Sequence, residues 1–168
     1  MNPSSITTQE IAEQDIFCFD FEKEFIVQAI QCIPMIVRYK LDTVGIKLSL
    51  AQWSRFSWFD RYQLSILACR EKNEFKQYEI FLIELLKHHG WFELTRLPLI
   101  GRMPDIPAGI LDLLNERLMD LGHQIDEAQW KDLTDLERFA LSKLIRKDHE
   151  SKNLIPALVE FGILKPPG

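Results

Sequence analysis

The sequence predicts an all-α protein, a compact single domain built from two related helical repeats. Three observations support this prediction. Apolar residues recur at helical spacing along most of the 168 residues. Residue pairs that cap helix N-termini stand before several of these segments. One stretch of the chain occurs twice, as residues 45–67 and, with substitutions, as residues 122–144.

The N-terminal part combines a polar tail with a short extended segment. Residues 1–14 are polar and have little periodicity, so we expect a flexible tail before a single helical domain over residues 15–168. Phe17, Phe19 and Phe21 alternate with other residue types. This period of two predicts a short extended segment that places aromatic rings on the core.

The domain is expected to consist of two lobes. Lobe one covers about residues 15–90 and lobe two covers residues 107–168. Between them, residues 91–106 contain prolines and a glycine and are predicted to form a loop. In lobe one, Asn73 is expected to cap the longest helix, over residues 74–89.

Further start and stop signals occur in both lobes. Pro34 and Pro107 are each expected to begin a helix, and Gly45 and Gly122 to end it. Shorter helices should follow wherever two residues have the spacing of a capping box, namely Ser49/Gln52, Ser57/Asp60, Asp126/Gln129 and Thr134/Glu137.

The two copies align without a gap when residue i is set against residue i+77. Eight pairs are identical: Gly45/Gly122, Ala51/Ala128, Gln52/Gln129, Trp53/Trp130, Arg61/Arg138, Leu64/Leu141, Ser65/Ser142 and Leu67/Leu144. Residues present in both copies favour a structural role. We therefore expect the paired tryptophans, and apolar pairs such as Phe59/Leu136, in the core. The paired arginines should bond a helix C-terminus or a carboxylate.

Residues that differ between the copies are better candidates for function. Trp58, Tyr62 and Ile66 lie four residues apart and share one helix face, where the second copy has Asp135, Phe139 and Lys143. Two explanations are open. Another segment of lobe one covers this apolar face, or the face is a groove for a protein partner centred on Trp58.

A second candidate contact is basic. Arg38, Lys40, Lys47 and Arg55 occur close together in the sequence, with Asp42 as the one acid among them. Such residues commonly form a solvated face, in which Arg38 and Asp42 would pair. The alternative is a docking patch for an acidic protein or an anionic group.

Other classes of function lack a pattern. The chain contains no P-loop, dinucleotide-binding or nucleophile-elbow motif, and its histidines and three cysteines lack metal-ligand spacing. We therefore expect no catalytic site, cofactor or metal. A net charge of -5 disfavours nucleic acid as a partner. The absence of a long apolar run, of a signal peptide and of paired cysteines predicts a cytoplasmic protein outside the membrane. No pattern indicates an oligomeric state.

The stretch C-I-P-M-I-V-R-Y-K-L-D-T-V-G-I-K-L-S-L-A-Q-W-S-R-F, preceded by F-D-F-E-K-E-F, resembles the signature of the cyanobacterial nitrate reductase-associated protein family, also called NarM. The resemblance covers residues 17–67. It implies a small non-enzymatic protein that assimilatory nitrate reductase, a molybdopterin and iron–sulfur enzyme, needs to become or stay active.

The sequence and this resemblance together predict an accessory or maturation factor that binds nitrate reductase through the Trp58 face or the basic residues. Two alternatives stay open. The protein could be a regulatory helical adaptor for another cytosolic protein, or it could bind an anionic small molecule of the molybdopterin type.

Overall fold

The computed structural model describes residues 16–27, 30–98, 104, 106–145 and 152–166. These residues form nine α-helices and one short 3-10 helix, with no β-strand among them, which confirms the all-α prediction. The predicted flexible tail, residues 1–14, lies outside the described ranges. None of the described helices is long and apolar enough to cross a bilayer.

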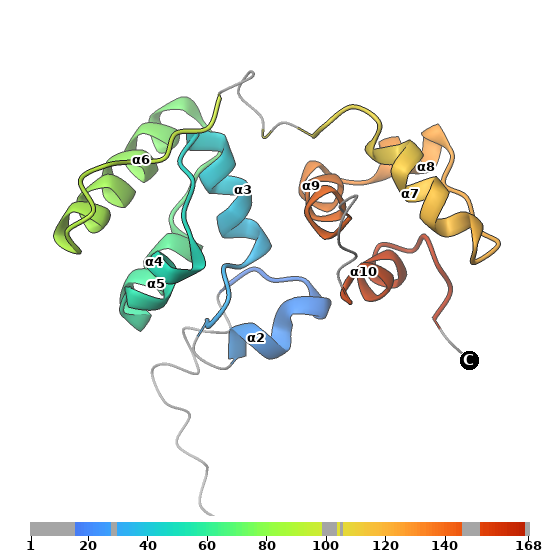
Figure 1. Ribbon diagram of the computed structural model, residues 1–168, viewed down its shortest axis with the longest axis horizontal. Coiled ribbons are helices and arrows are strands. Elements are labelled where there is room, and N and C mark those ends of the chain that lie inside the picture. Colours follow the sequence, from blue (N-terminus) through green and yellow to red (C-terminus); the bar gives the residue numbers. More distant parts are fainter. Residues whose placement is uncertain (1–15, 28–29, 99–103, 105, 146–151, 167–168) are drawn as a thin grey trace, which may run out of the picture. The chain divides into compact units, whose positions relative to one another are not determined.

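The chain divides into two compact units (Figure 1). Unit 1 comprises Met1–Cys18 and Glu22–Pro104, and unit 2 comprises Phe19–Phe21 and Asp105–Gly168. The main boundary, between Pro104 and Asp105, falls inside the predicted loop 91–106.

Unit 1 contains five α-helices, with the longest, α6, beside α3 and α5. The helices are α2 (Lys23–Val27), α3 (Met35–Val44), α4 (Leu50–Arg55), α5 (Trp58–Ile66) and α6 (Lys72–His88). Their apolar stripes meet in one core, where Val37, Trp53, Leu64 and Leu82 are each 0% exposed. Burial of these stripes stabilises helices that are too short to be stable alone.

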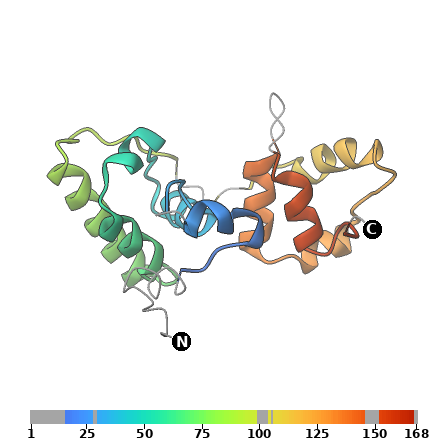
Figure 2. The same ribbon diagram turned by 90° about the horizontal axis from the view of Figure 1, so that it is seen from below.

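Unit 2 contains four α-helices, and α10 packs against α9 (Figure 2). The helices are α7 (Ile110–Met119), α8 (Glu127–Asp132), α9 (Asp135–Leu144) and α10 (Leu154–Glu160). Leu114, Phe139, Leu141 and Leu158 are fully buried in this unit.

The capping boxes predicted from the sequence are all confirmed. Ser49, Ser57, Asp126 and Thr134 each accept a hydrogen bond from the backbone N–H three residues ahead, and the side chain of that residue accepts from the cap in return. Gly45 ends α3 with φ of 68°, a left-handed conformation that costs glycine little.

Several other predicted helix ends are wrong. Helix α3 begins at Met35, so Pro34 is its N-cap rather than part of its first turn. Helix α6 begins two residues before the expected start, because Glu74 accepts from the N–H of Glu71, and Asn73 lies inside the helix. Helix α7 begins after Gly109 rather than at Pro107 and ends at Met119, three residues before Gly122.

The predicted N-terminal extended segment forms no strand. Phe17 is 54% exposed, whereas Phe19 packs edge-on against Phe161, with ring centroids 5.0 Å apart. The Glu160 carboxylate accepts hydrogen bonds from the N–H groups of Asp20 (2.8 Å) and Phe21 (3.1 Å). These contacts explain why Phe19–Phe21 belongs to unit 2 while the residues on both sides belong to unit 1.

The first part of the predicted loop is held against unit 1. Thr95 accepts a hydrogen bond from the N–H of Lys47 (2.9 Å), and the N–H of Leu97 donates to the carbonyl of Gly45 (2.9 Å). The Arg96 guanidinium binds the Glu79 carboxylate on α6 at 2.6 Å. Residues 95–97 therefore pair with residues 45–47, directly after α3, instead of forming a free connection.

The local structure of the two repeated stretches is similar, with one difference at the tryptophans. Arg61 donates to the carbonyls of Trp53 and Ser54, and Arg138 donates to those of Trp130 and Lys131, so each arginine binds the C-terminal end of the preceding short helix as expected. Trp53 is 0% exposed and donates from Nε1 to the Ile30 carbonyl (2.9 Å). Trp130 is only half-buried, which corrects the expectation that both tryptophans lie in the core.

Candidate partner-binding surface

One face of α5 carries large apolar side chains at or near the surface of unit 1. We define the α5 face as Trp58, Phe59, Tyr62 and Ile66. The capping box of Ser57 and Asp60 fixes the start of α5 and thereby sets which residues point outward. Buried Leu64 marks the opposite, core-facing side of the helix, and buried Ser65 lies beside Trp58 at the inner edge of the face.

Trp58 and Tyr62 form the inner edge of this face. Their rings are stacked with centroids 5.3 Å apart and an interplanar angle of 9°. Both are half-buried and pack against the core of unit 1. The two rings are therefore partly covered by unit 1 but not enclosed by it.

Phe59 and Ile66 form the outer edge, and the sequence interpretation missed the first of them. Phe59 was expected in the core with Leu136, yet it is 60% exposed, and Ile66 is 39% exposed. Helical spacing alone could not show whether Phe59 is buried or exposed. An apolar residue next to an apolar stripe extends that stripe in the sequence pattern, whether its side chain meets the core or the solvent. The sequence did contain one indication that this side of the helix is near the surface: the second copy has the charged residues Asp135 and Lys143 at the positions of Trp58 and Ile66.

The four basic candidates have different environments. Lys47 and Arg55 are exposed, and Arg55 lies at the end of α4. Arg38 is half-buried, and its Nε donates to the Ile33 carbonyl at 3.0 Å. Of the four basic candidates, Lys47 and Arg55 are therefore the two with exposed side chains.

Lys40 points into unit 1 rather than out of it. It is 7% exposed, and its Nζ donates to the carbonyls of Ser65 and Leu67, each at 2.7 Å, at the C-terminal end of α5. The ammonium also lies 5.7 Å from the centre of the Tyr78 ring. Burial lowers the pKa of Lys40 to about 8. This residue therefore connects α3 to α5 and is not presented to a partner.

The motif residues behind the family resemblance mostly have structural partners within unit 1. The buried Glu22 carboxylate accepts from the N–H of Met35 (3.0 Å) and so caps α3. Lys40 binds the end of α5, Ser49 and Gln52 cap α4, and Trp53 holds the Ile30 carbonyl. Ile30 has φ of 52°, which is rare for a β-branched residue, so its bond to Trp53 helps to keep a strained turn in place.

Two of the three cysteines, Cys32 and Cys69, are poorly suited to reactive chemistry. Burial raises the pKa of Cys69 to about 11, and burial followed by the charge of Glu22 raises the pKa of Cys32, so both stay thiols at neutral pH. Among the described residues, no three His, Cys, Asp or Glu side chains are grouped as a metal site.

An aromatic and histidine cluster beside α5 was not predicted. His89, directly after α6, lies between Phe56 and Trp91, with ring centroids 5.3 and 5.6 Å away. Its Nε2 is 3.9 Å from the Asp60 carboxylate. The cluster joins the end of α6 to the residues at the start of α5.

The fold and this surface together define a small all-helical protein with an apolar face on one unit. The chain belongs to the family described as conserved nitrate reductase-associated protein, whose model matches residues 18–161. The match confirms the resemblance seen in residues 17–67 and extends it over both units. Neither the curated proteins nor the solved structures contain a match.

Proposed function

We propose that this protein is a non-enzymatic cytoplasmic accessory factor that binds assimilatory nitrate reductase through the α5 face and supports its activity or cofactor assembly. The family description, which associates these proteins with nitrate reductase, supports the choice of partner. The exposure of Phe59 and Ile66 beside the Trp58 and Tyr62 stack is the observation that supports the choice of surface.

The α5 face has the composition of a protein contact. Aromatic residues are enriched in protein interfaces because they bury a large apolar area with few rotatable bonds, and clusters near the centre of an interface dominate binding. Trp58 and Tyr62 are already ordered by stacking and by packing on the core. Their binding therefore costs little conformational entropy.

Lys47 and Arg55 are proposed as secondary contacts at the rim. Both are exposed, and exposed charges at a rim raise the association rate more than they raise the affinity. Lys40 is left out of the proposed contact because its ammonium is bonded inside unit 1. Its burial removes one of the four cations from the basic patch that was predicted to dock an acidic protein or an anionic group.

Copurification from nitrate-grown cells tests the proposed partner. A tagged wild-type chain should recover nitrate reductase in stoichiometric amounts, and Phe59→Asp and Ile66→Lys should lose most of it. The second change copies Lys143 of the other repeat and is therefore compatible with a helix of this kind. Ile80→Lys on α6 is the matched control, because Ile80 is also exposed, at 46%, on another helix.

Two outcomes would reject the proposal. Stoichiometric recovery of a different protein, with nitrate reductase absent under mild washing, would favour the regulatory adaptor instead. Equal recovery of nitrate reductase by wild type, Ile66→Lys and Ile80→Lys would leave the partner in place but exclude the α5 face. Circular dichroism melting curves of each variant show that any loss is not due to unfolding.

A further inference from the structure

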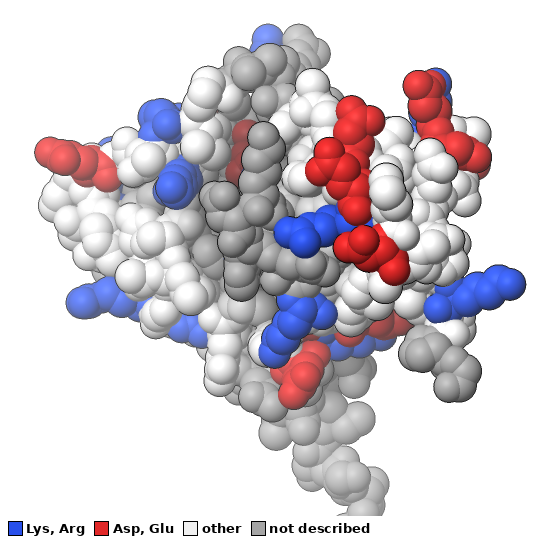
Figure 3. Space-filling view, turned by 45° about the vertical axis from the view of Figure 1, so that its right-hand side comes forward, with Lys and Arg blue, Asp and Glu red and all other residues white. Residues whose placement is uncertain are grey.

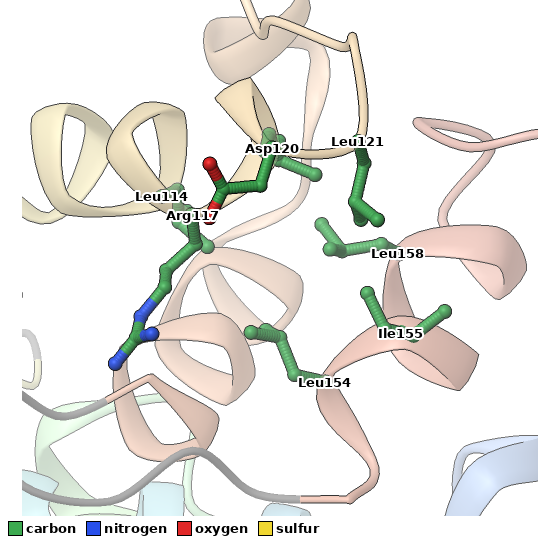
Figure 4. A pocket seen from close by; sticks show the side chains of 8 residues that line it. Leu114, Arg117, Asp120, Leu121, Leu154, Ile155 and Leu158 are labelled. Atoms are coloured by element: carbon green, nitrogen blue, oxygen red, sulfur yellow. The ribbon is translucent and has the colours of Figure 1, made fainter.

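Unit 2 contains an apolar groove between α7 and α10 that the proposed function does not use. We call it the α7 groove. Leu114 and Leu118 of α7, with Leu121 two residues after its end, line a cavity of about 230 Å³ together with Leu154, Ile155 and Leu158 of α10. Figure 4 shows this cavity. The floor of the groove is almost fully buried and consists of Leu114, Leu118, Leu154 and Leu158. At its edge, Leu121 is 52% exposed and Ile155 is 38% exposed.

The corresponding position of unit 1 shows what covers such a groove. With the same offset of 77 residues, Val44 at the end of α3 corresponds to Leu121, two residues after the end of α7. Val44 is 5% exposed and belongs to a core that includes Tyr78, Leu82 and Leu86 of α6. Helix α6 has 17 residues, whereas α10 has 7. Unit 2 thus lacks a long covering helix of its own among its described residues.

A second cavity, bounded by α7 and by Ser142 and Ile145 at the end of α9, lies beside the first half of α7, and we count it as part of the α7 groove. Ile110 and Leu113, in the first half of the helix, line this second cavity of about 510 Å³. Leu113, Arg117 and Asp120 are spaced by four and three residues, so they project from one side of α7. Leu113 lines the second cavity, whereas Arg117 and Asp120 line the cavity between α7 and α10. The two cavities therefore lie along one helix over roughly 15 Å, at 1.5 Å per residue.

Acidic side chains border the groove. Asp112, Glu116 and Asp120 are exposed and occur every fourth residue, so they form a line along α7. Acidic side chains gather over α7 on the face shown in Figure 3. Arg117, also exposed, is the basic residue within this stretch of the helix, so the border keeps a negative balance.

We propose that the α7 groove binds an amphipathic helix of a partner protein, with basic residues beside its apolar stripe. The apolar side chains of that helix would enter between α7 and α10, as those of α6 do against α3 in unit 1. Its Lys or Arg residues would meet Asp112, Glu116 and Asp120. This mode of recognition, in which an amphipathic helix lies in an apolar groove, needs no rearrangement of a preformed site.

Two synthetic peptides test the proposal on the full-length wild-type chain. Each is a labelled helix of about 15 residues with leucine at i, i+3, i+4 and i+7. One carries lysine and the other glutamate at the positions beside this stripe. Fluorescence anisotropy should give a Kd at least tenfold lower for the lysine peptide. Equal affinity for the two peptides, or no binding of either, would overturn the proposal.

Variants then locate the binding site. Asp112→Asn/Glu116→Gln/Asp120→Asn should weaken the lysine peptide at least tenfold, and Leu121→Ser/Ile155→Ser should do the same. The matched control Glu84→Gln/Glu93→Gln/Asp132→Asn removes three exposed acids that belong to other helices and loops than α7 and should change the Kd less than twofold. An equal loss in the control would show general attraction to an acidic protein and would contradict the assignment. All these side chains are exposed, so melting temperatures should remain close to wild type.

Sedimentation of the wild-type chain tests whether a second copy of this chain, rather than a partner protein, occupies the groove. Self-association that Leu121→Ser/Ile155→Ser abolishes would mean that a second copy of this chain fills the groove, which would also overturn the proposal.

Discussion

The ammonium nitrogen of Lys40 lies 2.7 Å from the carbonyl oxygen of Leu67, the residue that ends α5, although the two are 27 positions apart. The same nitrogen is equally close to the Ser65 carbonyl. Carbonyl groups at the C-terminal end of a helix have no hydrogen-bond donor within the helix. Lys40 of α3 supplies a donor to two such carbonyls at the end of α5. The orientation of α5, and with it the position of the α5 face, depends on this bond.

Replacement of Lys40 by methionine should therefore destabilise the protein. Methionine fills a similar volume but cannot donate, so two carbonyls in the interior lose their partner, which costs about 2–4 kcal/mol in free energy of unfolding. Urea denaturation measures the free energy of unfolding of the wild-type chain and of Lys40→Met. Lys47→Met is the control, because Lys47 is exposed and its loss should change stability by less than about 0.5 kcal/mol. Equal stability of both variants would contradict the structural role of Lys40.

Stability should also rise between pH 8 and pH 9. Burial lowers the pKa of Lys40 from 10.5 to about 8, so the unfolded chain binds more protons than the folded chain in this window. The free energy of unfolding then increases with pH, by roughly 0.5–1 kcal/mol over the unit. The neutral amine still has two N–H groups for the two carbonyls, so the bonds persist.

Above pH 9 the trend should level off and then reverse. Burial raises the pKa of Cys69 from 9.0 to about 11 and raises that of Tyr78. The folded chain keeps these protons longer, so both groups make stability fall as pH rises. Urea titrations at several pH values measure the curve. In Lys40→Met the rise from pH 8 to pH 9 should be absent, and a rise of equal size there would assign it to another group.

The two repeated tryptophans should differ in their contribution to stability. Trp53→Phe removes buried volume and the donor to the Ile30 carbonyl, so we expect a loss of about 2–4 kcal/mol. Trp130→Phe should cost less than about 1 kcal/mol, because Trp130 is half-buried. Thermal or chemical denaturation of the two variants compares them directly. Similar losses would mean that Trp130 is as much a part of a core as Trp53.

The contact between Glu160 and the Asp20–Glu22 helix should control local exchange. Glu160→Ala removes the acceptor of the Asp20 and Phe21 amides, so their hydrogen exchange should speed up at least tenfold while exchange in α3 stays unchanged. Glu127→Ala is a suitable control, since Glu127 is an exposed partner of Lys131 on α8. Unchanged exchange at Asp20 and Phe21 in Glu160→Ala would contradict the contact.

The sequence predicted the features that depend on neighbouring residues. The capping boxes, such as Ser57 with Asp60, need only two side chains three residues apart, so spacing alone identified them. The roles of Glu22 and Lys40 depend on partners 13 to 27 positions away, which local patterns do not contain. For this reason Lys40 was assigned to a surface patch.

Exposure was the other property that spacing did not predict. Phe59 and Leu64 are both apolar residues of α5, yet one is 60% exposed and the other is fully buried. Which side of a short helix meets the core is decided by the helices packed against it, here α3 and α6. The difference between the two copies at Trp58 and Ile66 pointed to a face of α5 on which Ile66 is exposed, because it compared positions with the same local structure.

A calorimetric titration of purified nitrate reductase with this protein tests the central claim most directly. We expect wild type to bind, Ile66→Lys and Phe59→Asp to bind at least tenfold more weakly, and Ile80→Lys to bind as wild type does. Loss of a central apolar contact of this kind costs more than 1.4 kcal/mol, which is tenfold in Kd. The absence of any heat of binding with the wild-type chain, or equal Kd values for Ile66→Lys and Ile80→Lys, would contradict the account.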